Sequence, residues 1–146
     1  MENLIRIVKQ EHKTGCGVAC VAICLGWSYP EAFEKFKKVL NWGSRKSVFY
    51  TKAPELARVL ESEGIPHDVL RSGRWENIEG TAIVGVNRKS GYWHWVVAVK
   101  DADRFFIVDP ELGEIYQHQN WPHDYKCGPR NSYYIRLGDA ARCVSI

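Results

Sequence analysis

The hydrophobic pattern of this chain changes its period once, near Pro66, and that change restricts the folds open to it. Before Pro66 apolar residues recur at the spacing of helical faces, and after it they alternate with polar residues as in half-buried strands. Helices followed by strands favour an α+β domain, with an N-terminal helical half packed on a C-terminal antiparallel sheet. The 146 residues, 45% of them hydrophobic, suffice for one such domain over the whole chain, 1–146.

Three helices are expected in the first half. Residues 17–25 are apolar throughout and are followed by Gly26, a frequent type of helix terminator. Pro30 opens a second helix with Ser28 as its cap, and Thr51 begins a third. The second and third helices each carry an apolar stripe that would face a core, made by Ala32, Phe33, Phe36, Val39 and Leu40 and by Leu56, Val59 and Leu60.

Strands are expected in the second half, at residues 67–70, 81–87, 92–100, 104–109, 114–118 and 132–137. The polar connections 87–91 and 100–103 are short enough for hairpins, so the strands that they join should be antiparallel. The groove between a helical half and a sheet is a natural place for a functional site.

Charge and hydropathy argue against nucleic acid and membranes as partners. The formal net charge is only +3 and the basic residues are scattered, so no binding to nucleic acid is expected. The densest basic cluster, Lys35, Lys37 and Lys38, lies on the predicted second helix and is interpreted as a solvated face. The longest apolar run, from Val18 to Trp27, is about half as long as a membrane-spanning helix. No membrane span and a cytoplasmic location are therefore expected.

The five cysteines favour free thiols over a disulfide framework. Cys16, Cys20 and Cys24 recur every four residues along one side of the predicted first helix, where Cys20 and Cys24 should be buried fillers. Cys127 and Cys143 stand alone and supply no second ligand pair for zinc. No metal ion is therefore expected.

Cys16 lies where a loop becomes the first helix, a position that stabilises a thiolate, the nucleophilic form of cysteine. The flanking Gly15 and Gly17 would let the backbone turn tightly and let a substrate approach. Gln10 is near enough in sequence to return an amide N–H to the same spot as an oxyanion donor. A structural cysteine and a surface glutamine would give the same pattern, so the pair needs a base to support it.

The base is predicted from strand register. In a two-residue hairpin closed by Lys100 and Asp103, His94 lies opposite Asp109, with Cβ atoms about 5 Å apart on one face of the sheet. A four-residue loop would keep this register, and a three-residue loop would break it. An Asp beside an imidazole fixes its tautomer and stabilises its cation, so His94 is the predicted base and Asp109 its partner.

The remaining aromatic and imidazole groups are given structural interpretations. His12, His67, His118 and His123 have no acid placed opposite by so simple a register, although His118 and His123 are alternatives to His94 as the base. Trp93 and Trp95 flank the predicted base and are interpreted as core residues, with a wall of the groove as the alternative.

Three segments together resemble a known family. Residues 10–20 (QEHKTGCGVAC) are similar to the nucleophile segment of the bacteriocin-processing, double-glycine leader peptidases. Residues 94–97 (HWVV) resemble their base motif, and residues 109–113 (DPELG) resemble their acid motif. The segments follow the family's order, although Gly15 stands where the transporter-linked members usually carry Asp.

The resemblance implies a papain-like fold and hydrolysis of a peptide bond by Cys16, His94 and Asp109, with Gln10 in the oxyanion hole. It implies a peptide or protein substrate, cut after Gly-Gly in that family, and it requires neither a metal nor an organic cofactor. The segment 121–125 has no counterpart in the resemblance. Two alternatives remain: an amide hydrolase or acyltransferase with the same residues, and a non-catalytic peptide- or protein-binding module on the same fold.

Overall fold

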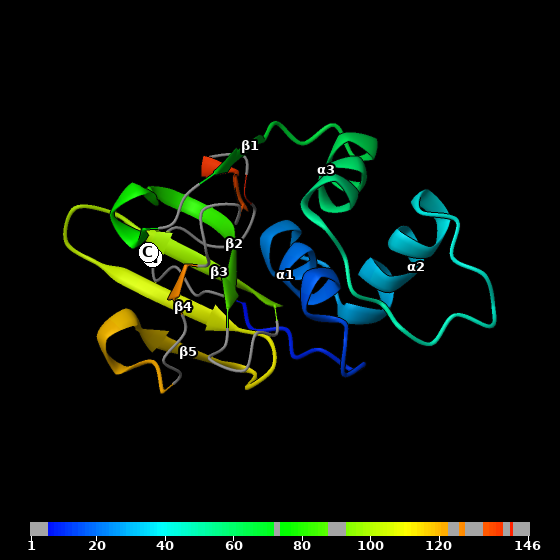
Figure 1. Cartoon of the computed structure of the whole chain (residues 1–146), viewed down its shortest axis with the longest axis horizontal. Helices are drawn as coiled ribbons and strands as arrows, with labels where there is room; N and C mark the ends of the chain where they lie inside the picture. Colours follow the sequence, from blue (N-terminus) through cyan, green and yellow to red (C-terminus); the bar gives the residue numbers. More distant parts are fainter. Residues whose placement is uncertain are drawn as a thin grey trace.

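The described part of the chain forms three helices and one antiparallel sheet, so the predicted α+β class is confirmed. The computed structural model describes residues 6–71, 74–87, 93–122, 126–127, 133–138 and 141. Figure 1 shows the helices gathered on the right and the sheet on the left, as expected for a chain whose helices precede its strands.

The helices begin and end close to the predicted positions. They are α1 (Cys16–Leu25), α2 (Tyr29–Val39) and α3 (Ala53–Ser62). Gly26 ends α1 in the left-handed conformation, with φ of 74°. Ser28 caps α2 through a capping box with Glu31, in which the Glu31 N–H donates to Ser28 Oγ at 3.2 Å. All ten residues of α1 are buried because the helix is apolar on every side and contacts α2, α3, β2 and β3.

The predicted start of the third helix at Thr51 is wrong. The helix begins at Ala53, and Lys52 before it is extended, with φ of −97° and ψ of 163°. Thr51 stays outside the helix because its carbonyl accepts a hydrogen bond from the Trp95 indole at 2.8 Å. This bond fixes the segment before α3 against the sheet.

The sheet has the strand order β1-β7-β2-β3-β4-β5, with the short β6 paired to the end of β2. The strands are β1 (Asp68–Arg71), β2 (Gly80–Asn87), β3 (Trp93–Lys100), β4 (Phe105–Asp109), β5 (Glu114–Gln117), β6 (Lys126–Cys127) and β7 (Tyr133–Arg136). Each predicted strand is present with its ends shifted by at most a residue. The short β6 and two 3-10 turns, η1 (Trp75–Asn77) and η2 (His118–Asn120), were not predicted.

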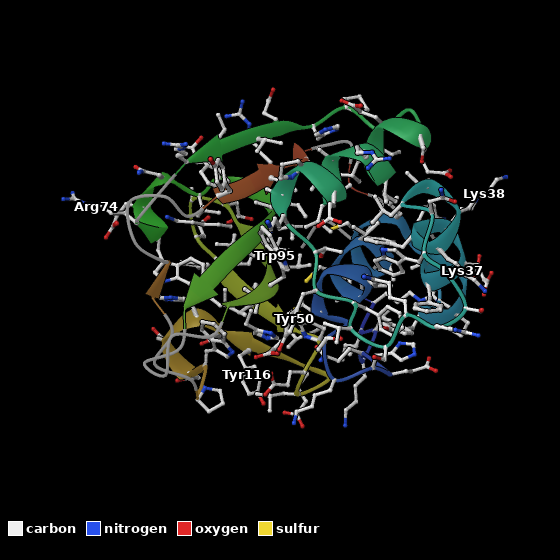
Figure 2. All side chains as sticks on the ribbon, turned by 45° about the vertical axis from the view of Figure 1, so that its right-hand side comes forward. Lys37, Lys38, Tyr50, Arg74, Trp95 and Tyr116 are labelled. Atoms are coloured by element: carbon white, nitrogen blue, oxygen red, sulfur yellow. The ribbon has the colours of Figure 1, made fainter. Side chains whose placement is uncertain are left out.

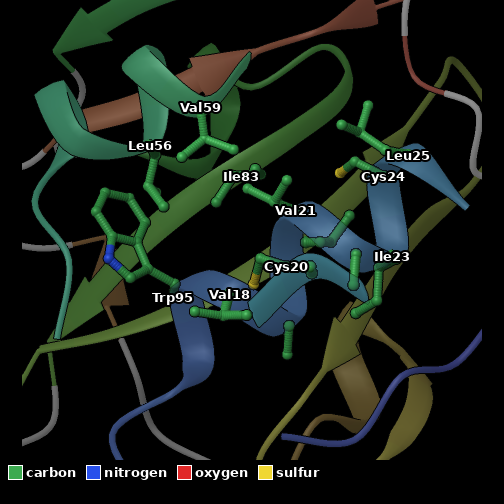
Figure 3. Close-up of a cluster of buried hydrophobic side chains, with 14 of the residues drawn as sticks. Val18, Cys20, Val21, Ile23, Cys24, Leu25, Leu56, Val59, Ile83 and Trp95 are labelled. Atoms are coloured by element: carbon green, nitrogen blue, oxygen red, sulfur yellow. The ribbon is translucent and has the colours of Figure 1, made fainter. Parts of the chain in front are cut away.

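The sheet separates two hydrophobic clusters, and alternate residues of its central strand β3 belong to one or the other. Trp95, Val97 and Val99 face the helices, whereas Val96 and Ala98 lie in the cluster on the other side of the sheet. Figure 3 shows the helix-side cluster, in which side chains of α1 and α3 meet Ile83 and Trp95, together with Cys20 and Cys24. Both of these cysteines are 0% exposed, which confirms their prediction as buried residues.

The predicted register of the β3–β4 hairpin is wrong by two residues. Lys100 pairs with Phe105, whereas a two-residue loop would have paired it with Asp103. The loop is longer because the Asp101 side chain accepts hydrogen bonds from the backbone N–H groups of Asp103 and Arg104, both at 2.9 Å. A shift of two residues keeps every side chain on its predicted face of the strand.

The surface agrees with the sequence interpretation of the basic cluster. Lys35, Lys37 and Lys38 are exposed, and Figure 2 shows Lys37 and Lys38 at the outer edge of α2. Lys35 forms an ion pair with Glu63 on the α3 side at 3.2 Å. Within the described ranges, no individual helix has the length and hydropathy needed to cross a membrane.

The packing of α3 on α1 gives a first prediction. Leu56 is 0% exposed, so Leu56→Ala should lower the free energy of unfolding by about 2–5 kcal/mol, because it removes buried apolar surface and leaves a cavity. Val48→Ala is the control: that side chain is 51% exposed, and its loss should change stability by no more than about 0.5 kcal/mol. Urea unfolding followed by tryptophan fluorescence measures both, and equal effects of the two substitutions would contradict the described core.

Candidate active site

Cys16 is the first residue of α1 and is 4% exposed. The chain reaches it through a tight turn in which the Gly15 N–H donates to the His12 carbonyl at 3.0 Å. The first N–H groups of a helix have no partner inside the helix, and the helix dipole adds partial positive charge at this end. The Cys16 sulfur therefore lies at the positive end of the α1 dipole.

The glycines beside Cys16 are required by packing. Gly15 has φ of −92°, which any residue can adopt, but a Cβ there would collide with the Tyr29 hydroxyl. A Cβ on Gly17 would collide with the Thr51 hydroxyl. The missing side chains therefore leave room for a neighbouring hydroxyl at both positions, a role that the sequence did not indicate.

The Tyr29 hydroxyl also fixes the loop before the nucleophile. It hydrogen-bonds His12 Nδ1 at 2.8 Å, and the His12 ring packs against Phe33 and Phe49 with centroid distances of 4.7 Å and 4.6 Å. Burial is the main cause that raises the pKa of Tyr29 to about 12, so the hydroxyl stays neutral at physiological pH. His12 is therefore a structural residue of the loop, as predicted from its lack of an acidic partner.

His94 and Asp109 meet at the end of the sheet beside α1. His94 Nε2 lies 3.0 Å from Asp109 Oδ1, with the two side chains 3% and 0% exposed. The Cys16 side chain also hydrogen-bonds His94, and the Trp95 N–H donates to Cys16 Sγ at 3.5 Å. The structure thus brings together the predicted nucleophile, base and acid.

The Asp109 carboxylate is held by several donors besides His94. Its Oδ1 also accepts from the backbone N–H of Glu111 at 3.0 Å and of Leu112 at 3.4 Å. The Trp121 indole N–H donates to Oδ2 at 3.0 Å. The turn that supplies the backbone donors closes at Gly113, whose φ of 69° favours glycine.

These contacts set the charges of the pair. Burial alone lowers the pKa of His94, but the hydrogen bond to Asp109 and the contact with Cys16 outweigh it and raise the pKa to about 9. Burial raises the pKa of Asp109, but the bonds from His94, Trp121 and Glu111 outweigh it and lower that pKa. At neutral pH the pair is an imidazolium beside a carboxylate.

Gln10 bridges the nucleophile loop and the acid turn. Its backbone N–H donates to the Pro110 carbonyl at 2.9 Å. Its side-chain amide nitrogen donates to the carbonyls of His12 at 3.1 Å and Lys13 at 2.9 Å. Both amide hydrogens are therefore directed at the loop before Cys16 in this state, which places Gln10 at the site as a residue that shapes the loop.

Glu111 and Trp121 belong to the site and were missed as site residues. Glu111 Oε2 lies 3.8 Å from His94 Nδ1. The register of β3 and β4, extended beyond its last pair, leads from His94 to Glu111, so a four-residue turn at residues 101–104 would have indicated this contact. No sequence signal of that kind leads to Trp121, which reaches Asp109 from a separate segment.

The other candidates lie elsewhere or outside the described residues. His118 stacks on Phe105 with a centroid distance of 4.2 Å, and His67 bonds the Ile65 carbonyl at 2.8 Å. Trp95 is buried in the helix-side core, as interpreted. His123, Cys143 and the side chains of Trp93 and Cys127 fall outside the described parts. Across the described residues, no group of His, Cys, Asp and Glu is arranged to hold a metal ion.

A comparison of the sequence with protein-family models finds no match, and a comparison with curated proteins finds none either. The resemblance to bacteriocin-processing peptidases therefore stays a prediction from its three segments.

The charge state of His94 gives the second prediction. In an NMR titration of the histidine rings, His94 should lose its proton near pH 9, and Asp109→Asn should move that midpoint toward lower pH by removing the partner charge. The raised pKa also makes the pair stabilise the fold at pH below about 6.5, a contribution that is lost as pH rises through about 9. An unshifted His94 midpoint in the Asp109→Asn variant would contradict the pairing.

The contact of Gly17 with Thr51 gives the third prediction. Alanine normally favours a helix over glycine by about 1 kcal/mol. Gly17→Ala should nevertheless destabilise the protein by about 1–3 kcal/mol, because its Cβ meets the buried Thr51 hydroxyl. Adding Thr51→Ala should restore most of that loss relative to Thr51→Ala alone. A Gly17→Ala variant as stable as the wild type in urea unfolding would show that the two segments are not in contact.

Proposed function

We propose that this chain is a cysteine peptidase with a papain-like fold, similar to the bacteriocin-processing peptidases, that hydrolyses a peptide bond through Cys16, His94 and Asp109. The observation that carries the proposal is that the His94 imidazole contacts both a buried carboxylate and a thiol at the N-terminus of a buried helix. A papain-like arrangement is supported by the nucleophile on the helical half and the base and acid on neighbouring strands of the sheet.

The proposed reaction starts from a Cys16 thiolate beside the His94 imidazolium. Nε2 of His94 is held by Asp109, so Nδ1 carries the proton that is later given to the leaving amine. The thiolate attacks the carbonyl carbon, and the imidazolium then gives its proton to the leaving amine. Water, deprotonated by His94, attacks the resulting thioester and releases the acid and the free thiol. The steps need no cofactor.

The oxyanion of the tetrahedral intermediate is stabilised by hydrogen-bond donors directed at it. The backbone N–H of Cys16, at the start of α1, is one proposed donor. Gln10 is the other, and it becomes available when its amide releases one of the two loop carbonyls that it now binds. A charged acceptor favours that exchange, because hydrogen bonds to an ionised oxygen are stronger than those to a neutral carbonyl.

The proposed substrate is a peptide or protein chain, and the three family-like segments make a Gly-Gly site the first sequence to test. The fourth prediction concerns hydrolysis of a peptide library that includes Gly-Gly sequences, read by mass spectrometry. The wild type should cleave a subset of the peptides, and Cys16→Ala should reduce the rate by at least about a thousandfold. Cys20→Ala, one helical turn further and fully buried, is the matched control and should remain active.

Two results would contradict the proposal. Equal cleavage by the wild type and Cys16→Ala would exclude Cys16 as the nucleophile. A wild type that cleaves no peptide but transfers an acyl group from Cys16 to added amines would favour an acyltransferase with the same residues.

A further inference from the structure

Trp121 lies in the hydrophobic cluster on the side of the sheet away from the helices and is 8% exposed. Its ring packs edge-on against Trp75, with centroids 6.1 Å apart and an interplanar angle of 87°. It follows η2, and its backbone N–H donates to the His118 carbonyl at 3.2 Å. Packing and backbone therefore both fix where the indole points.

The indole N–H is directed at one particular oxygen. Asp109 Oδ1 is shared by His94 and two backbone N–H groups, whereas the donor that the described residues supply to Oδ2 is Trp121, at 3.0 Å. The carboxylate is completely buried, so an oxygen without a donor would destabilise the ionised form strongly. A phenylalanine could fill the same space but could not satisfy that oxygen.

We propose that Trp121 is a positioning residue of the site: its indole N–H holds the second oxygen of Asp109, so that the carboxylate stays ionised and presents its first oxygen to His94. The expected effect of Trp121 on the rate of hydrolysis rests on the proposed function. Its expected effect on the ionisation of Asp109 does not. The strands β3 and β4 and the turn after β4 place His94 and Asp109. Trp121 adds a hydrogen bond to the Asp109 carboxylate from a separate segment.

The fifth prediction compares Trp121→Phe with Trp75→Phe. Both substitutions remove an indole from the same cluster, but only the first removes a donor to Asp109. With p-nitrophenyl acetate as the probe, Trp121→Phe should reduce the rate of ester hydrolysis roughly 10- to 100-fold, the range expected for a lost hydrogen bond to a charged group. It should also move the acid limb of the pH–rate profile to higher pH, because the carboxylate is protonated more easily.

Trp75→Phe should leave the acid limb at its wild-type position. Coincident acid limbs for the wild type and both variants would overturn the proposal and leave Trp121 as a packing residue, whatever the change in absolute rate. A packing defect alone lowers stability without moving that limb.

A measurement on the wild-type protein tests the same contact if Trp121→Phe does not fold. The indole N–H resonance of Trp121 should shift as Asp109 is protonated in the acid range, with the same midpoint as the Asp109 side-chain carbon resonance. Different midpoints would overturn the proposal. This readout needs no catalysis, so an inactive chain would count against the peptidase and not against the role of Trp121.

Discussion

The Asp109 carboxylate is completely buried, and the groups that satisfy it hold the site together. A buried charge is tolerated only when it is paired and hydrogen-bonded, since several kcal/mol of hydration are lost otherwise. Here an imidazole, two backbone N–H groups of the following turn and an indole share that task. The carboxylate thus joins β3, β4, the turn after β4 and the segment after η2, and together with the contact from Cys16 it raises the pKa of His94 to about 9.

Hydrogen bonds and close contacts of the loops around α1 hold the helical half of the chain against the His94–Asp109 pair. Gln10 joins the nucleophile loop to the carbonyl of Pro110, next to the acid, and Thr51 joins the start of α3 to Trp95, next to the base. Glycines at 15 and 17 allow hydroxyl groups of Tyr29 and Thr51 to lie against the backbone on either side of Cys16. The position of the sulfur relative to the imidazole therefore depends on both halves of the chain.

Much of this arrangement could be predicted from the sequence, because its strongest signals are local. The apolar run that ends at Gly26 gives α1 and places Cys16 at its start, and alternation gives β3 and β4. The His94–Asp109 contact was predicted from a register that is two residues off, and it survived because such an error preserves the face of each strand.

The remaining features depend on side-chain contacts that the hydrophobic pattern does not encode. The Asp101 side chain lengthens the turn locally, the Trp95 indole holds Thr51 out of α3, and Trp121 approaches Asp109 from another segment. The spacing of residues in a single sequence does not show which of these contacts form. The same holds for Gln10, whose distance along the chain from Cys16 did not show that its amide binds the loop between them.

Cross-linking of the sulfur to the imidazole tests the central arrangement most directly. Dibromoacetone alkylates a thiol and can then alkylate a nearby ring nitrogen, so digestion and mass spectrometry of the treated protein report which residues it joins. The account predicts a covalent bridge between Cys16 and His94 that is absent from His94→Gln. Alkylation of Cys16 without a bridge to His94, or a bridge to another histidine, would contradict the account.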